Sequence, residues 1–191
     1  MSRTVLITGG CGFIGVNLVR LWRSMHPADR ILNLDALTYA GNLESLGDLE
    51  EGPGYRFVRG DILDGDLLES LFTTEDVQVV LHLAAESHVD RSILGPEAFV
   101  QTNVVGTFRL LEAARKAWGD EAEDRLFVYV STDEVYGDLG PDEAPWAEDR
   151  PLVPSSPYSA SKAAGDHLAH AYGHTYGLPV AVTHCSNNYG P

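Results

Sequence analysis

Short runs of β-branched and aliphatic residues alternate along the chain with longer segments whose apolar residues recur every three or four positions. The short runs predict strands and the longer segments predict helices. This alternation is typical of an α/β fold in which a doubly wound parallel sheet of about six strands has helices on both faces. The expected strands are 4–8, 30–35, 55–59, 77–83, 126–131 and 180–185, and the expected helices are 13–25, 42–49, 65–72, 96–118 and 157–176.

The composition indicates one folded domain. Of the 191 residues, 44% are hydrophobic, which excludes a disordered or collagen-like chain. The chain contains no run of about 20 apolar residues, so no membrane-spanning helix is predicted. We therefore expect residues 1–191 to form a single domain. The segment 137–156 is rich in Pro and acidic residues, lacks periodicity and predicts a long loop.

Acidic residues outnumber basic residues by 28 to 13, and the formal net charge is −15. Such a surface repels polyanions, so nucleic acid is not an expected partner. An anionic ligand would have to be held by a local device, such as a backbone loop that binds phosphate. Cys11 and Cys185 show no disulfide or metal-ligand spacing, and no segment resembles a signal peptide. We therefore expect a cytoplasmic protein without a metal site.

The glycine-rich segment TGGCGFIG lies between the first predicted strand and the first predicted helix. Gly10, Gly12 and Gly15 fit the pattern GxGxxG, and Gly9, Gly12 and Gly15 fit the wider GxxGxxG. Glycines allow a tight turn and let backbone amides at the positive end of the helix dipole approach a pyrophosphate. An ordinary turn could carry the same glycines, but the position between strand and helix favours a dinucleotide site.

Acidic residues after the next two strands bear on which dinucleotide is bound. Asp35 ends the second strand, where a carboxylate accepts hydrogen bonds from ribose hydroxyls and repels a 2′-phosphate. We therefore expect NAD and not NADP, although Asp35 could simply open the following loop. Asp61 could accept a hydrogen bond from the adenine amino group or cap a helix. His82 lies inside an apolar strand and is expected to be a core histidine.

Tyr158 and Lys162 lie four positions apart at the start of the last predicted helix, so their side chains share one face. A neighbouring ammonium lowers the pKa of a phenol, which would make the Tyr158 phenolate available as a base near neutral pH. The chain has only two lysines, Lys116 and Lys162, so a YxxxK pattern seldom arises in it by chance.

The fifth predicted strand runs into STDEVYG, which places Thr132, Asp133 and Glu134 at the same edge of the sheet as the glycine-rich segment. Different surroundings can separate the pKa values of two carboxyl groups, leaving one protonated acid and one ionised base. Elimination of water from adjacent carbons requires such a pair. Asp133 and Glu134 could instead be surface acids of an acid-rich chain, but the nearby Tyr158 and Lys162 favour catalysis.

Together these segments carry a family resemblance. TGGCGFIG, Asp35, STDEVYG and YSASK are similar to the extended short-chain dehydrogenases/reductases, which have a Rossmann fold. LAAESHVDRSI, TNVVGT and SNNYGP narrow the resemblance to the dTDP-glucose 4,6-dehydratases, and it extends over all 191 residues. The glycine motif and YxxxK are shared across the superfamily, whereas the TDE triplet and AAESHVDRSI are the more specific marks.

The resemblance implies three sets of site residues. The catalytic set is Thr132, Asp133, Glu134, Tyr158 and Lys162. The set that contacts the sugar nucleotide is Ser87, Thr132 and Asn187. The set that binds NAD is Gly9, Gly12, Phe13, Ile14, Gly15, Asp35, Ala36, Leu37, Thr38, Asp61, Ile62, Leu83, Ala84, Ala85, Ser87, Thr102, Tyr158, Lys162 and Asn188.

The resemblance also implies a reaction. Tyr158, supported by Lys162, takes the proton of the sugar C4 hydroxyl while a hydride passes from C4 to NAD. Glu134 removes the proton from C5, which the 4-ketone has acidified, and Asp133 protonates the departing C6 hydroxyl. The hydride then returns to C6, so NAD is regenerated and the product is a 4-keto-6-deoxy sugar nucleotide.

Two departures from the family pattern stand out. His184 occupies a position where Arg or Asn is expected. The carboxyl-terminal part that binds the nucleotide half of the substrate in the family has no counterpart in these 191 residues, so we expect it to be absent from the chain.

Two other functions remain open. A sugar-nucleotide 4-epimerase shares the fold, NAD, Tyr158 and Lys162 but needs no acid/base pair, so Asp133 and Glu134 favour the dehydratase. A non-catalytic NAD-binding module is the second alternative. The helix 96–118 carries more apolar surface than one sheet face needs, and relatives pair this helix and the Tyr158 helix across a dimer, so we expect a homodimer.

Overall fold

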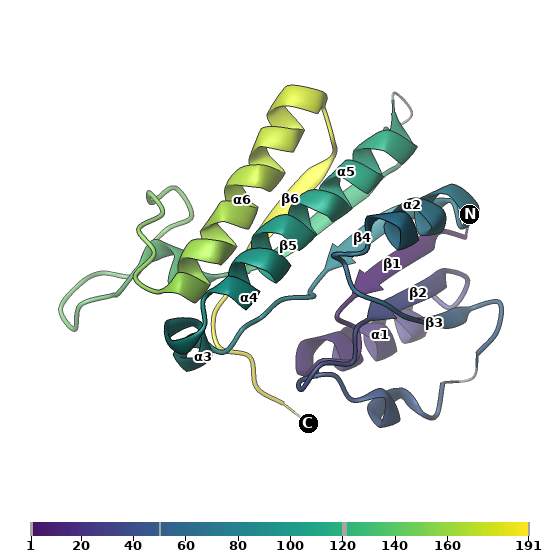
Figure 1. Ribbon diagram of the computed structural model, residues 1–191, viewed down its shortest axis with the longest axis horizontal. Helices are drawn as coiled ribbons and strands as arrows, with labels where there is room; N and C mark the ends of the chain where they lie inside the picture. The colour runs from purple at the N-terminus through teal and green to yellow at the C-terminus, as the bar shows by residue number, and fades with distance from the viewer. Residues whose placement is uncertain (1, 50, 120–121, 191) are drawn as a thin grey trace.

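The computed structural model describes residues 2–49, 51–119 and 122–190 and has an α/β fold (Figure 1). Within these residues six parallel strands form one sheet in the order β3-β2-β1-β4-β5-β6, which confirms the predicted fold class. Each strand agrees with its prediction to within one residue. The strands are β1 (Thr4–Thr8), β2 (Arg30–Asp35), β3 (Tyr55–Arg59), β4 (Val77–His82), β5 (Leu126–Thr132) and β6 (Val180–Cys185).

Helices cover both faces of the sheet. On one face lie α2, α5 and α6, and on the other lie α1 and the short turn η1 (Figure 1). The helices are α1 (Phe13–Met25), α2 (Gly65–Thr74), α3 (Val89–Leu94), α4 (Glu97–Phe99), α5 (Thr107–Trp118) and α6 (Pro157–Tyr176). Three further helical turns are η1 (Leu43–Leu46), η2 (Val100–Gly106) and η3 (Asp133–Tyr136).

The central strand β1 supplies residues to the cores on both faces of the sheet. Leu6 packs in the cluster beneath α2, α5 and α6, whereas Val5 and Ile7 pack in the cluster beneath α1. All three side chains are fully buried. The alternation follows from the two-residue period of a strand, and it explains why β1 is apolar at every one of these positions. No helix in the described part of the chain is long and apolar enough to span a membrane.

Two predicted helices differ from the structure. Residues 42–49 form only the 3-10 turn η1, which begins where the Asn42 side chain accepts the Glu44 N–H and ends at Gly47. A segment of eight residues is too short to offset the cost of helix nucleation, and the Asn42 side chain bonds the backbone of the turn instead. The predicted helix 96–118 is helical over most of its length, but η2 interrupts it with a wider π-helical turn.

The segment between β4 and α4 contains α3, a short helix that the sequence pattern does not predict. Six residues hold less than two turns, so no apolar period can develop over them. By contrast, α1 and α6 have the predicted bounds, and residues 137–156 form the predicted loop.

Candidate active site

A cavity of about 470 Å³ opens at the carboxyl ends of the strands, where a parallel sheet of this kind binds its ligands. Its volume lies within the range of roughly 300–1,000 Å³ that is usual for small-molecule sites. The cavity brings together most of the residues that the sequence indicates. Those lining it are Gly9, Gly12, Phe13, Ile14, Gly15, Asp35, Ala36, Thr38, Asp61, Ile62, Leu83, Ala84, Ala85, Ser87, Thr102, Thr132, Glu134, Tyr158, Lys162, Asn187 and Asn188.

Two of the expected residues, Leu37 and Asp133, are not among the lining residues of this cavity. Leu37 packs against the core beneath α1. Asp133 lines a smaller hollow of about 350 Å³ beside the cavity, and Glu134 lines both spaces. The two acids of the expected pair therefore both line the smaller hollow, and Glu134 also lines the cavity that contains Tyr158. Pro191, the last residue of SNNYGP, lies outside the described residues.

The turn between β1 and α1 requires glycine at two positions. Gly9 has a φ of +72°, and a Cβ there would lie 2.7 Å from the Ala84 nitrogen. A Cβ on Gly15 would lie 2.1 Å from the Gly9 oxygen, so α1 could not pack against the turn. The close packing lets Phe13 and Ile14, in the first turn of α1, line the cavity. The positive end of the α1 dipole thus faces the space where an anion would bind.

Asp35 is buried and held by two backbone amides. Its Oδ2 accepts the Cys11 N–H at 2.9 Å, and its Oδ1 accepts the Leu37 N–H at 2.8 Å. The second bond shapes the loop after β2, so Asp35 does open this loop. Each carboxylate oxygen has a further lone pair, so the side chain can also accept from a ligand in the cavity that it lines.

Asp61 and His82 have clear local roles. Asp61 Oδ1 accepts the Leu63 N–H at 2.9 Å, whereas Asp64 caps α2. His82 is fully buried, and its two ring nitrogens lie 2.8 and 3.0 Å from the hydroxyls of Thr8 and Thr107. Burial lowers the pKa of His82 to about 3, so the ring is neutral. The prediction of a core histidine is confirmed.

Tyr158 and Lys162 stand in the first two turns of α6 because of how this helix begins. Ser156 is the N-cap and forms a reciprocal capping box with Ser159, and Pro157 occupies the first turn. Both Tyr158 and Lys162 are buried and line the cavity.

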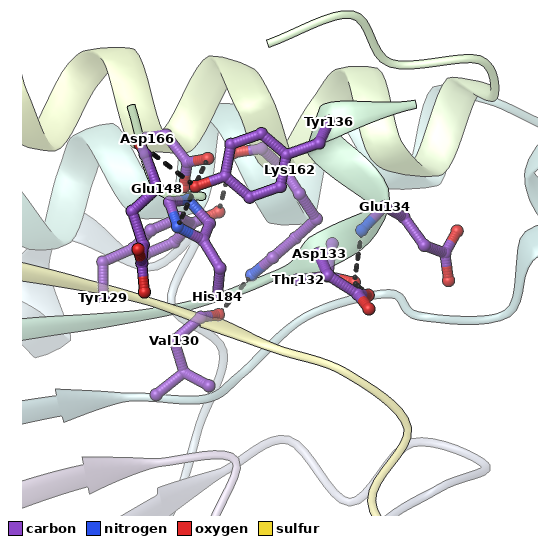
Figure 2. Close-up of polar contacts among 10 residues, drawn as sticks. All are labelled: Tyr129, Val130, Thr132, Asp133, Glu134, Tyr136, Glu148, Lys162, Asp166 and His184. Atoms are coloured by element: carbon purple, nitrogen blue, oxygen red, sulfur yellow. Dashed lines mark hydrogen bonds and ion pairs between the residues drawn. The ribbon is translucent and has the colours of Figure 1, made fainter. Parts of the chain in front are cut away.

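The ammonium of Lys162 points to the sheet. Its Nζ donates to the Val130 carbonyl at 2.7 Å and lies 4.2 Å from the centre of the Tyr129 ring (Figure 2). Burial lowers the pKa of Lys162 to about 8. Burial and the Glu134 charge raise the pKa of Tyr158 to about 12. The predicted lowering of the phenol pKa by Lys162 is therefore wrong for this arrangement, because burial of the phenol and, after it, the Glu134 charge raise that pKa.

Thr132 fixes the start of η3, which carries the acid pair. Its Oγ1 accepts the Glu134 N–H at 3.3 Å and lies 3.4 Å from Asp133 Oδ1 (Figure 2). Burial raises the pKa of Glu134, and the charges of Asp133 and Asp138 add to this shift. A carboxyl group with a raised pKa is a stronger base once ionised, which suits proton abstraction.

Sequence reasoning missed the role of Asn103, a buried residue of η2. Its Oδ1 accepts the Glu86 N–H, and its Nδ2 donates to the Glu86 carbonyl and to Ser161 Oγ, each at 2.8 Å. Ser161 Oγ in turn contacts the Tyr158 carbonyl at 2.7 Å. Asn103 thus ties the cavity wall at Glu86 to the helix that carries Tyr158. A polar residue within an apolar helical pattern is the signal that could have revealed it.

His184 connects three elements beside the smaller hollow. Its Nδ1 lies 2.9 Å from the Tyr136 hydroxyl, and its Nε2 lies 3.2 Å from Oδ2 of the buried Asp166 (Figure 2). The residue that departs from the family pattern therefore joins β6 to η3 and α6, and it does not line the larger cavity.

Comparison with known proteins assigns the family. Residues 6–191 match the family model described as GDP-mannose 4,6 dehydratase. The chain belongs to this dehydratase family. It is 56% identical over 192 residues to the dTDP-glucose 4,6-dehydratase of Xanthomonas campestris pv. campestris, an alignment that covers 98% of this chain and 54% of the relative. The chain thus spans about half the length of the curated relatives it matches, and the resemblance to dTDP-glucose 4,6-dehydratases is confirmed.

Solved structures agree with this assignment. The dTDP-glucose 4,6-dehydratase of Bacillus anthracis, in complex with NAD, is 47% identical with a TM-score of 0.87 over 100% of this chain and 56% of that chain. That of Streptomyces venezuelae, with NAD bound, is 49% identical with a TM-score of 0.88 over 99% of this chain and 57% of that chain. The UDP-glucose 4-epimerase of Thermus thermophilus is 32% identical with a TM-score of 0.82, over 95% and 54%.

Proposed function

We propose that this chain supplies the NAD-binding and catalytic residues for the dehydration of dTDP-glucose to dTDP-4-keto-6-deoxyglucose. The observation that carries the proposal is a single cavity lined both by the glycine-rich turn with Asp35 and by Thr132, Glu134, Tyr158 and Lys162. The residues of the cavity fit a dinucleotide for two reasons. The glycines of the turn have no Cβ atoms, so the backbone packs closely there, and the Asp35 carboxylate keeps free lone pairs that can accept hydrogen bonds from a ribose.

When bound, NAD would accept a hydride from C4 of the sugar and return it to C6. The remaining steps belong to side chains of this chain. Tyr158 would take the proton of the C4 hydroxyl, and Glu134 would take the proton of C5 and give a proton back to C5 when C6 receives the hydride. Asp133 would protonate the hydroxyl that leaves C6, acting from the smaller hollow that adjoins the cavity at Glu134.

The phenol of Tyr158 needs help to act as a base, because its pKa is about 12. Lys162 is the cationic group that lines the cavity with Tyr158. A turn of its ammonium from the Val130 carbonyl towards the phenol would lower the pKa of Tyr158. We propose this movement as part of forming the reactive site.

The epimerase alternative rests on the shared fold and on the presence of Tyr158 and Lys162. Glu134 argues against it, because a carboxylate that lines the cavity beside Tyr158 is suited to removing a carbon-bound proton. The other alternative is an NAD-binding module without catalysis. The dehydratase changes the mass of the substrate, whereas the two alternatives leave it unchanged and differ in whether an isomer of the substrate forms.

The test is incubation of the chain with NAD and dTDP-glucose in D2O, followed by liquid chromatography and mass spectrometry. The proposal predicts a product that has lost one water and carries one deuterium at C5, because the proton taken by Glu134 exchanges with solvent. The variant Glu134→Gln should form little product, and Glu97→Gln, an exposed carboxylate on α4, is the matched control. A new chromatographic peak of unchanged mass would favour the epimerase, and unreacted dTDP-glucose alone would favour the binding module.

A further inference from the structure

A side-chain contact connects two loops that both contribute residues to the lining of the cavity. Residues 36–42 follow β2, and residues 83–88 follow β4. Strand β1 lies between β2 and β4 in the sheet, so the glycine-rich turn after β1 lies between the two loops. Residues of all three segments line the cavity. A side chain that joins the two loops therefore connects the segments on either side of the glycine-rich turn.

Tyr39 makes this connection. Its hydroxyl donates to Glu86 Oε2 at 3.2 Å, and the guanidinium of Arg91, on α3, lies 3.9 Å from the centre of its ring. Burial and the Glu86 charge raise the pKa of Tyr39, so the phenol keeps the proton that it donates. The tyrosine is 51% exposed, so these two polar contacts, and not apolar burial, hold its ring in place. We call Tyr39, Glu86 and Arg91 the clasp.

One side of the clasp is rigid. The Glu86 backbone is fixed at both its N–H and its carbonyl by the buried side chain of Asn103. The other side is a short loop held at its two ends, where the Leu37 N–H bonds Asp35 and the Asn42 N–H bonds the Cys11 carbonyl at 2.8 Å. Tyr39 lies between those two anchors, in a turn that the Gly41 N–H closes by donating to the Thr38 carbonyl at 3.1 Å, so rotation of its side chain breaks neither anchor.

We propose that the clasp closes over a dinucleotide in the cavity and slows its release. The inference rests on the proposed function, in which the same cofactor must take the hydride from C4 and later return it to C6. A cofactor that left between the two transfers would leave the sugar oxidised and the cycle incomplete. Slow release therefore has a direct use in this reaction, and the clasp is the contact that a departing dinucleotide would have to open.

The test measures the release rate of the cofactor and not turnover. The chain is loaded with NADH, excess NAD is added, and the loss of bound NADH fluorescence is followed. Tyr39→Leu removes both clasp contacts and should speed release about tenfold, whereas Tyr39→Phe and Arg91→Met each remove one contact and should have smaller effects. The double variant Tyr39→Leu/Arg91→Met should release NADH no faster than Tyr39→Leu, because the two residues act together.

The matched control is Tyr176→Leu, at the far end of α6. Tyr176 is 55% exposed and also lies beneath an arginine, with Arg115 4.9 Å from its ring centre. Its loss should leave the release rate unchanged. Equal release rates for the wild type and all clasp variants would overturn the clasp but leave the cofactor assignment intact. A wild-type chain that binds no NADH would overturn both.

Discussion

Asn103 offers the sharpest test of how the site is held together. The substitution Asn103→Ala removes three hydrogen bonds, two to the Glu86 backbone and one to Ser161 Oγ. A typical intramolecular hydrogen bond contributes about 1 kcal/mol to stability, so the expected loss is about 3 kcal/mol in the free energy of unfolding. For a chain of this length that corresponds to a fall in Tm of roughly 6–12 °C.

The assay is urea denaturation followed by circular dichroism, together with hydrogen exchange at the Glu86 amide. Exchange at this amide should become much faster in Asn103→Ala, because the side-chain oxygen that accepts its hydrogen bond is gone. The matched control is Gln101→Ala, an exposed residue of the same helical turn, which should change stability by less than about 0.5 kcal/mol. The role assigned to Asn103 would be refuted if Asn103→Ala changed the free energy of unfolding by less than about 0.5 kcal/mol and the Glu86 amide remained protected from exchange.

Three more predictions address the turn, the pH dependence and the assembly. Gly9→Ala should weaken NAD binding at least tenfold by calorimetry and lower Tm, since its Cβ would meet the Ala84 backbone at a φ of +72°; wild-type affinity would contradict this. The hydrogen bond from Arg115 lowers the pKa of Glu112 and burial raises it, and the net effect lowers this pKa to about 2. The unfolded state therefore binds the proton first, so this carboxylate stabilises the fold above about pH 4.5, and that contribution should disappear between there and about pH 2. Urea curves should show less acid sensitivity in Glu112→Gln over that window, and an unchanged pH profile would count against the pairing. We also propose a homodimer through the exposed Val100 and Phe108, so the wild type should sediment as a dimer and Phe108→Asp as a monomer; a monomeric wild type at micromolar concentration would exclude it.

The strands could be predicted closely because burial on two faces leaves a strong pattern. The run that became β1 is apolar or β-branched throughout, which is typical of a strand that is buried on both faces. The start of α6 was predictable for a local reason, because Ser156 and Pro157 cap and open the helix. The proximity of the site residues could also be predicted, because the carboxyl ends of parallel strands lie at one edge of the sheet.

The features that could not be predicted from the sequence depend on tertiary contacts that no local sequence pattern encodes. The direction of the Lys162 ammonium is set by the Val130 carbonyl on another element, so the spacing to Tyr158 could not reveal it. The part played by Asn103 likewise depends on where Glu86 lies in space. The apolar surface of the helix 96–118 was overestimated, because Phe99 and Leu111 are buried in the fold and contribute nothing to an exterior face.

The most direct test of the central claim is a crystal structure of this chain with NAD and a dTDP-sugar bound. We predict that the adenosine ribose will lie at Asp35, the pyrophosphate at the glycine-rich turn, and the nicotinamide ring beside Tyr158 and Lys162, with Glu134 facing the sugar. A nicotinamide ring bound away from Tyr158, or a Glu134 carboxylate turned out of the cavity, would contradict the account.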